Sequence, residues 1–183
     1  MSPSQAGSCS TCPARRHRVV QTCGVLRAII GFHQDEVGDW VADLRCLHRQ
    51  HVRHRPPFWD RPWVLTESGR AEHLGLDLDC PLCDRAEIPD GLHVVRTAGP
   101  FDAATLPMGL RADHRVADGR WAMLRVLEGA VRFTMDTDPP VAVHLVVGDE
   151  QAIPPGVAHR VIVEDGMRIV IDFLEKQHDD DAG

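Results

Sequence analysis

Alternating apolar and polar positions divide the chain into a short β-rich segment, an irregular stretch and a longer β-rich half. Apolar runs over 25–33 and 40–44 flank a polar turn, and this pattern predicts a β-hairpin. A further short strand is expected over 61–65 and a helical turn over 67–76. The stretch from 45 to 62 is dense in Arg, His and Pro, so an irregular conformation is expected there.

The second half carries short runs rich in Val, Ile, Leu and Phe, separated by Gly, Pro and Asp turns. Strands of this length and spacing predict an antiparallel sandwich or barrel. The expected strands cover residues 121–127, 130–135, 141–147, 160–163 and 167–173.

Composition and charge argue against a membrane protein and against a general nucleic-acid-binding protein. None of the apolar runs in the 183 residues approaches the roughly 20 needed to cross a bilayer, so no membrane contact is expected. The net charge of −7 argues against general nucleic-acid binding. Residues 89–183 carry all of that excess, so we expect the arginines of 45–61 to dock onto the second half. The first 18 residues lack the apolar core of a signal peptide, which predicts a cytoplasmic protein.

The six cysteines all precede residue 84. Thiols in a cytosol stay reduced, so cysteines near clustered histidines indicate a metal, above all zinc, rather than disulfides. Cys80 and Cys83 supply one ligand pair on the tight turn expected over 80–84. Cys46 and His48 can supply the second pair, and His51 and then His54 compete with His48 for the fourth place. Histidines that are merely solvated are the alternative, and a spare histidine would be free for another ligand or a second metal.

Three further cysteines lie in or near the polar N-terminal segment, which has no packing signal. We expect this segment to be dispensable for the fold. Reactive thiols here would instead favour a redox or metal sensor. These residues are Cys9, Cys12 and Cys23.

The first half resembles a small bacterial domain of unknown function over about residues 26–86. That family usually has Cys-Gly-His where this chain has Cys46-Leu47-His48, which spares the ligands but replaces a flexible residue. The resemblance implies no activity. The residues that carry it are Gly31-Phe32-His33-Gln34-Asp35, Asp39-Trp40-Val41-Ala42, Gln50-His51-Val52-Arg53-His54-Arg55-Pro56-Pro57, Arg61-Pro62-Trp63-Val64 and Cys80-x-x-Cys83-Asp84.

The second half contains the spacing G-x5-P-x-G-x2-H, from Gly148 to His159, which is the second cupin motif without its last Asn. By strand alternation His159 is expected at the barrel mouth, on one face with Val161 and Val163. The first cupin motif is degraded, because Ala122 stands where the family has Glu and only His114 remains of the usual histidine pair. His144 is expected to be structural.

This half resembles the TehB/YeaR-like cupin domain over about residues 96–175, a family associated with tellurite resistance and responses to nitrogen oxides. The resemblance implies a double-stranded β-helix barrel and pairing of two copies as a homodimer. The residues that carry it are Leu106-Pro107-Met108-Gly109-Leu110, His114, Trp121, Val126-Leu127-Glu128-Gly129, Ile153-Pro154, His159-Arg160-Val161 and Ile171-Asp172-Phe173.

The predicted fold class is therefore mainly β, with a small zinc-bound α+β N-terminal domain followed by a cupin barrel. The predicted boundaries are a flexible extension over 1–24, the Cys/His domain over 25–88, the cupin over 96–176 and an acidic tail over 177–183.

The leading functional hypothesis is a non-enzymatic, metal-binding stress protein. Zinc would be structural in the first domain, and the cupin would hold a small ligand or a second divalent metal (Zn, Fe, Mn or Ni) at His114 and His159. The alternatives are a cupin oxygenase or isomerase that uses the same two histidines, and the redox or metal sensor. The absence of the usual Glu, replaced by Ala122, counts against the enzyme hypothesis. A further alternative is that the two histidines bind no ligand. Asp172 is either a third ligand or, as we favour, paired with an arginine such as Arg168.

Overall fold

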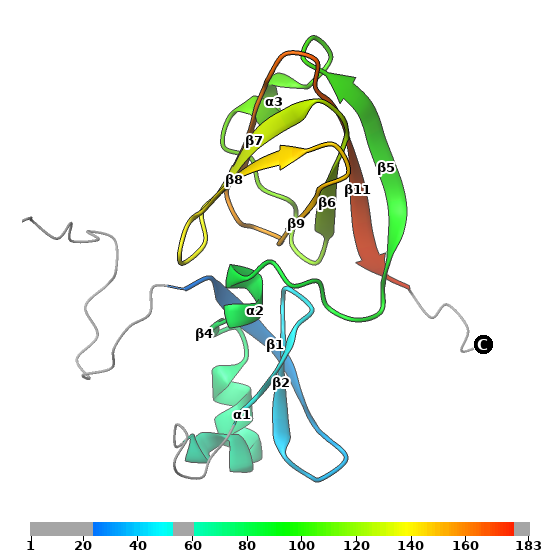
Figure 1. Ribbon diagram of the computed structural model, residues 1–183. Helices are drawn as coiled ribbons and strands as arrows, with labels where there is room; N and C mark the ends of the chain where they lie inside the picture. The colour runs from blue at the N-terminus through cyan, green and yellow to red at the C-terminus, as the bar shows by residue number, and fades with distance from the viewer. Residues whose placement is uncertain (1–23, 53–60, 178–183) are drawn as a thin grey trace, which may run out of the picture.

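In the computed structural model, which describes residues 24–52 and 61–177, the first half of the chain is organised by an antiparallel hairpin (Figure 1). Its turn is held by Asp35, whose carboxylate accepts backbone N–H hydrogen bonds from Val37 at 3.0 Å and Asp39 at 2.9 Å. Two short strands extend the hairpin into a four-stranded sheet of order β3-β2-β1-β4. The strands are β1 (Leu26–Gln34), β2 (Trp40–Leu44), β3 (Arg49–His51) and β4 (Asp77–Asp79).

The prediction of a strand over 61–65 is wrong. This segment forms a single 3-10 turn over Pro62–Leu65, because Pro62 has no N–H for a strand ladder and its fixed φ suits the first helical position. The third strand is instead β3, within the stretch that was expected to be irregular. The helix expected over 67–76 is present as α1 (Glu67–His73), capped by the Thr66 side chain, and α2 (Pro81–Asp84) follows β4.

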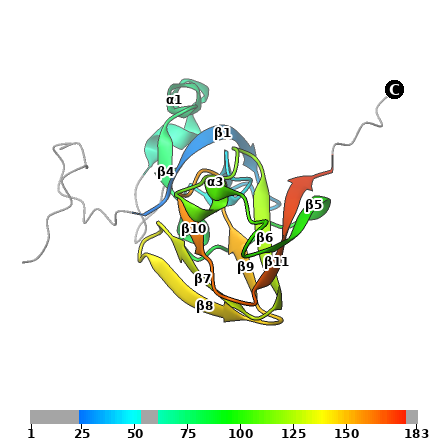
Figure 2. The same ribbon diagram turned by 90° about the horizontal axis from the view of Figure 1, so that it is seen from above.

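The second half is a two-sheet β-barrel, with one three-stranded sheet of order β10-β7-β8 and one four-stranded sheet of order β5-β11-β6-β9 (Figures 1 and 2). Ala122, Leu124 and Val126 alternate into its core, so the inward face of β6 is apolar. Every strand expected here is present, and β5 and β9 are additional. The elements are β5 (Leu92–Asp102), α3 (Met108–Arg111), β6 (Trp121–Glu128), β7 (Ala130–Met135), β8 (Val141–Val146), β9 (Glu150–Ile153), β10 (His159–Ile162) and β11 (Arg168–Lys176).

The two halves share a core at their junction. Trp121 begins strand β6 of the barrel, but its ring is fully buried among the core residues of the first domain. Leu174 of β11 joins the same cluster, next to Cys46 and Cys80. The predicted fold class, mainly β with a small α+β domain before a cupin barrel, is confirmed. Within the described ranges, no helix has the length and apolar character needed to cross a bilayer.

Candidate metal centre

Four buried side chains from two distant parts of the first domain meet at one point. Cys46 and His48 flank the turn between β2 and β3, and Cys80 and Cys83 lie at the start of α2. One potential ligand atom from each lies within 4.8 Å of all the others. The three cysteines are free thiols, so the group could hold a metal ion.

Four of the six distances between these atoms match the edges of a tetrahedral zinc site. Zinc bonds of about 2.3 Å to sulfur and about 2.0–2.1 Å to nitrogen imply edges of about 3.8 Å between two sulfurs and about 3.6 Å between sulfur and nitrogen. The Sγ atoms of Cys46 and Cys80 are 3.8 Å apart. His48 Nδ1 lies 3.5, 3.4 and 3.6 Å from the Sγ atoms of Cys46, Cys80 and Cys83.

Two tight turns bring these atoms together. Leu47 has a positive φ of 74°, which reverses the chain between Cys46 and His48. The second turn starts at Pro81, and the Cys83 N–H donates to the Cys80 carbonyl at 2.9 Å. Each turn therefore presents two ligand atoms on one side of the backbone.

The hydrogen bond of the other His48 nitrogen selects the tautomer. His48 Nε2 lies 2.9 Å from the backbone carbonyl of Glu87, which can only accept, so Nε2 carries the proton. The Nδ1 lone pair is then directed at the three sulfurs. A histidine ligand held through its second nitrogen in this way is typical of metal sites.

The thiols form one electrostatic unit. The pKa of Cys46 is lowered to about 3, because Cys80 and Cys83 donate hydrogen bonds to its thiolate, and the backbone N–H of His48 and the charge of Arg27 lower it further. The pKa of Cys83 is raised, because its proton is held by Cys46 and Cys80 and because the site is buried. A divalent cation would displace the remaining protons, so metal binding should release protons.

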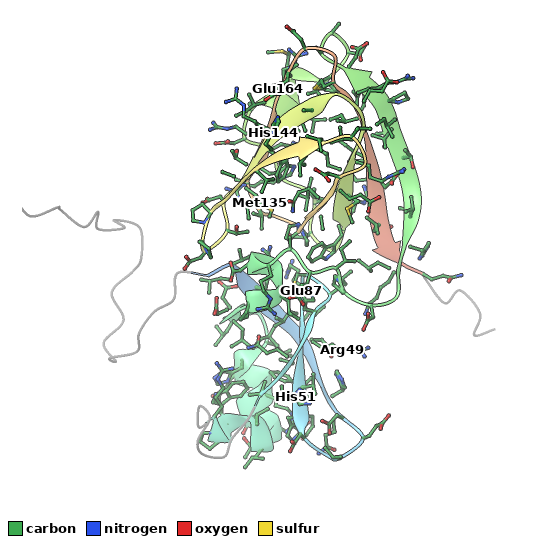
Figure 3. The ribbon with its side chains drawn as sticks, in the orientation of Figure 1. Arg49, His51, Glu87, Met135, His144 and Glu164 are labelled. Carbon is green, nitrogen blue, oxygen red and sulfur yellow. The ribbon has the colours of Figure 1, made fainter. Side chains whose placement is uncertain are left out.

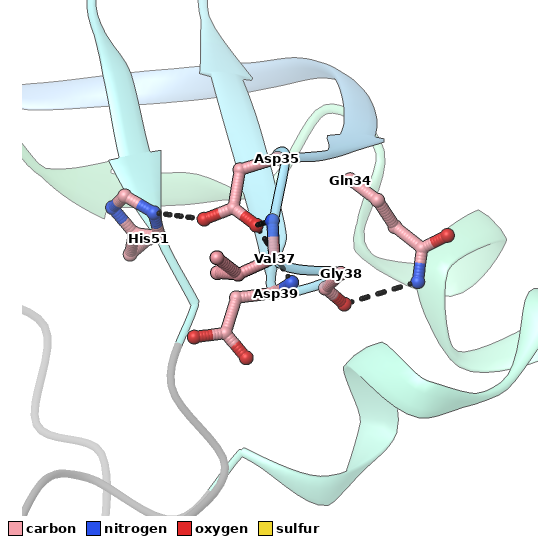
Figure 4. A network of polar contacts seen from close by, with 6 residues as sticks. All are labelled: Gln34, Asp35, Val37, Gly38, Asp39 and His51. Atoms are coloured by element: carbon pink, nitrogen blue, oxygen red, sulfur yellow. Dashed lines mark hydrogen bonds and ion pairs between the residues drawn. The ribbon is translucent and has the colours of Figure 1, made fainter.

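The structure does not bring His51 to this cluster. Its Nε2 lies 2.8 Å from the Asp35 carboxylate. Figure 4 shows this contact at the hairpin turn. In Figure 3 His51 lies toward the end of the first domain that faces away from the barrel, whereas Glu87 lies near the junction. His54, Cys9, Cys12 and Cys23 lie outside the described residues.

The barrel histidines form a pair rather than a ligand cluster. His114 and His159 exchange two backbone hydrogen bonds, of 2.8 and 2.9 Å, and their rings meet edge to face at 5.4 Å. His159 Nδ1 is 2.9 Å from the Val157 carbonyl. Burial lowers the pKa of His159, and the charges of His114 and Arg115 lower it further. Across residues 24–52 and 61–177, the Cys46 group is the one set of three or more His, Cys, Asp or Glu ligand atoms that could hold a metal.

Two other polar residues of the barrel have structural partners. Asp172 is buried and paired, as favoured, but with Arg125 at 2.7 Å and with the Thr97 hydroxyl; Arg168 pairs with Glu128 instead. His144 is exposed and lies 3.3 Å from Glu164 (Figure 3).

Sequence reasoning missed the side chains that surround the cluster. Arg27 donates to Cys83 Sγ at 3.3 Å, and Trp121 donates to the Cys46 carbonyl at 2.8 Å. An arginine on a strand and a tryptophan at the start of another have no local pattern that marks them as neighbours of a cysteine turn. Of the arginines in 45–61, Arg45 does reach the second half, where it lies 3.6 Å from Asp118.

Comparison with known proteins supports both resemblances. Residues 30–87 match the family described as "Protein of unknown function (DUF3565)", and residues 96–171 match the TehB-like domain. Curated proteins gave no significant match.

Several solved structures are similar to part of the chain. A protein from Escherichia coli K12 is 23% identical with a TM-score of 0.46, over 50% of this chain and 98% of that one. TehB from Haemophilus influenzae is 20% identical with a TM-score of 0.42, over 48% of this chain and 32% of TehB, so the match spans about a third of that protein. An RmlC-like cupin from Shewanella frigidimarina is 26% identical with a TM-score of 0.29, over 38% of this chain and 58% of that one.

Proposed function

We propose that this protein, which joins a DUF3565 domain to a TehB-like domain, holds one structural zinc ion in its first domain. The ligands would be the Sγ atoms of Cys46, Cys80 and Cys83 and the Nδ1 atom of His48. The observation that carries the proposal is the agreement of four of the six distances between the ligand atoms with the edges of a zinc tetrahedron.

The donor set favours a closed zinc site over a catalytic one. Four protein ligands fill a tetrahedron and leave no position for water or substrate, which is the arrangement of structural zinc. Three thiolates are soft ligands that disfavour magnesium, calcium and manganese. All four residues are buried, with His48 5% exposed and the cysteines 2% or less, so exchange with solvent should be slow.

The cellular role that we propose is a cytoplasmic stress response, related to tellurite or nitrogen oxides. This part rests on the resemblance of the second half to the TehB/YeaR-like family. In this role the first domain is a zinc-stabilised support, and the barrel binds a small ligand. A homodimer belongs to the same proposal.

A second candidate function is a metal-dependent cupin enzyme. The observation that favours it is the contact between the His114 and His159 rings, with His159 Nδ1 committed to Val157. The remaining His159 nitrogen would then be free to bind a second, weaker divalent ion. Two histidines without a carboxylate should lose that ion to a mild chelator before the thiolate site does.

Metal analysis of the full chain, purified without a histidine tag, tests the proposal. We expect one tightly held zinc per chain and a second metal only if the barrel pair binds one. His48→Gln and Cys80→Ser should lose the tight zinc, whereas the matched controls His51→Gln and His73→Gln should keep it. A zinc-free wild type that takes up none on refolding with zinc would overturn the proposal. Loss of zinc from His51→Gln but not from His48→Gln would overturn the ligand assignment.

In the wild type, a mild chelator should release the barrel ion first. His159→Ala and His114→Ala should show no such release, because they cannot hold this ion, whereas Cys80→Ser should still show it. If all three variants release the same metal as the wild type, the barrel holds none at this pair. The redox-sensor alternative is tested by thiol titration before and after peroxide. That alternative requires loss of thiols from Cys9, Cys12 or Cys23 while zinc stays bound.

A further inference from the structure

The barrel supplies direct contacts to the residues of the metal cluster. The Trp121 ring stands edge-on to His48, with 5.3 Å between ring centroids, and its Nε1–H donates to the Cys46 carbonyl at 2.8 Å. Trp121 is fully buried. One barrel side chain therefore touches two of the four ligand residues, 75 and 73 positions earlier in the sequence.

Arg27 of β1 makes a second connection between the cluster and the barrel. Its Nε–H donates to Cys83 Sγ at 3.3 Å, and its Nη2 donates to the carbonyl of Pro155 at 2.6 Å. A Cβ atom added at Gly156 would lie 3.5 Å from Arg27 Nη1, so the barrel loop lies directly over the guanidinium. A single planar, permanently charged group thus spans a ligand sulfur and the loop.

The position of Arg27 suits the charge of a zinc-loaded site. Three thiolates and one Zn²⁺ leave one net negative charge in a buried site, and a buried charge needs a partner. Arg27 carries the balancing positive charge and a hydrogen bond to sulfur. Its side chain should therefore dock more firmly when zinc is present and all three cysteines are thiolates.

The loop that Arg27 contacts leads to the histidine pair of the barrel. Pro155 stands four residues before His159, and the intervening Val157 accepts the His159 Nδ1 hydrogen bond. The Gly156 N–H donates to Val116 at 2.8 Å, and the His159 N–H donates to His114 at 2.9 Å. Short, bonded segments thus connect the metal cluster to the pair.

We propose that the barrel completes the metal centre, so that zinc in the first domain fixes the loop 154–158 and, through it, His159. Arg27 and Trp121 are the positioning residues of this coupling. The inference rests on the proposed zinc site. By thermodynamic reciprocity, barrel contacts that strengthen zinc binding are themselves strengthened by zinc.

Zinc affinity in two variants tests whether the barrel contacts strengthen zinc binding. Arg27→Gln and Trp121→Phe should each keep one zinc per chain but bind it about 10- to 100-fold more weakly in competition with a chelator, the usual effect of losing an outer contact. The controls are Arg45→Gln, which loses the interdomain ion pair with Asp118, and Trp63→Phe, which changes a first-domain tryptophan whose ring stacks on His73. Both controls should stay within about twofold of wild type.

A cobalt-substituted protein gives a readout that a purely structural role would not change. Loss of the N–H···S hydrogen bond in Arg27→Gln should make the Cys83 thiolate a better electron donor. The thiolate-to-cobalt charge-transfer band should therefore move to lower energy, and Arg45→Gln should leave it in place. Wild-type affinity and an unmoved band in Arg27→Gln, together with wild-type affinity in Trp121→Phe, would overturn the inference.

Hydrogen exchange tests the direction from the metal to the barrel. Removing zinc from the full wild-type chain should speed exchange at the amides of Gly156 and His159, while the β7–β8 amides stay protected. Zinc should no longer protect those two amides in Arg27→Gln. If zinc binds the wild type but leaves their exchange unchanged, the coupling fails while the zinc site stands. If no zinc binds, the proposed function itself fails.

Discussion

Replacing Leu47 with glycine should leave the zinc-loaded protein more stable than replacing it with alanine, which reverses the usual order of these residues. Leu47 adopts a φ of 74° between Cys46 and His48. Its half-buried side chain packs on the first-domain core and lines a cavity of about 600 Å³ at the junction with the barrel. A positive φ is the region where glycine is favoured over other residues, so the backbone itself predicts the order of the two variants.

The magnitude follows from the backbone alone. A left-handed conformation costs an L-residue about 1–2 kcal/mol, and glycine avoids this cost. Glycine loses about 0.5–1 kcal/mol relative to alanine through the greater freedom of its unfolded chain. Both variants lose the same side-chain packing, which cancels between them. The glycine variant should therefore be more stable by about 1 kcal/mol.

Leu82 provides the matched control. It lies between Cys80 and Cys83, is also half-buried and lines the same cavity, but belongs to α2 with ordinary helical backbone. There alanine should be more stable than glycine by about 1 kcal/mol. The two pairs should thus differ in opposite directions, by about 2 kcal/mol in total.

Urea unfolding in a buffer with fixed free zinc measures both pairs, because a constant zinc concentration keeps the metal's contribution comparable. Midpoints and slopes should be compared for the four variants and the wild type. If Leu47→Ala proves as stable as Leu47→Gly while the Leu82 pair follows the helical order, the left-handed turn between Cys46 and His48 is refuted.

Three other predictions concern a buried histidine, a buried ion pair and the N-terminal segment. Because burial lowers the pKa of His159 below its ordinary 6.5, acidification protonates the unfolded chain first. Stability should therefore fall as the pH drops from about 6.5 toward the pKa of His159 in the folded protein. Thermal unfolding at several pH values should show a smaller fall for His159→Gln than for the wild type. Asp172→Asn should cost about 1–3 kcal/mol in urea unfolding, since it weakens a buried, charged hydrogen bond to the partly exposed Arg125. Glu128→Gln, at an exposed pair, should cost at most about 0.5 kcal/mol, and equal losses would contradict this reasoning. Deleting residues 1–18 should leave one zinc per chain, because the described cluster already offers four ligands; loss of zinc on deletion would make Cys9 or Cys12 a ligand.

The barrel could be predicted from the sequence because its information is local. Alternating apolar residues, such as Ala122, Leu124 and Val126, mark the inward face of β6 wherever the strand is placed. The failure over 61–65 is equally local, since Pro62 favours a helical start over strand pairing. Strand β3 was missed because three polar residues, Arg49 to His51, carry no alternation, and their pairing with β2 supplies the structure.

The metal cluster was predicted in part for the same reason. Cys80-x-x-Cys83 and Cys46-x-His48 each place two ligand atoms on one short turn, so their spacing indicates chemistry without a fold. The sequence could not select among His48, His51 and His54. His48 meets the thiols because a left-handed Leu47 turns it inward, while the hairpin directs His51 to Asp35.

The sequence by itself determined the β-rich barrel, the cysteine turns and the likeness to two families, because each depends on neighbouring residues. Only the tertiary structure decided that Trp121 packs on His48 and that Arg27 joins Cys83 to Pro155. Such contacts join residues 56 to 128 positions apart, and one partner is often a backbone carbonyl. Every residue carries a carbonyl, so no residue type signals which one will be used; the packing of the first domain against the barrel makes that selection.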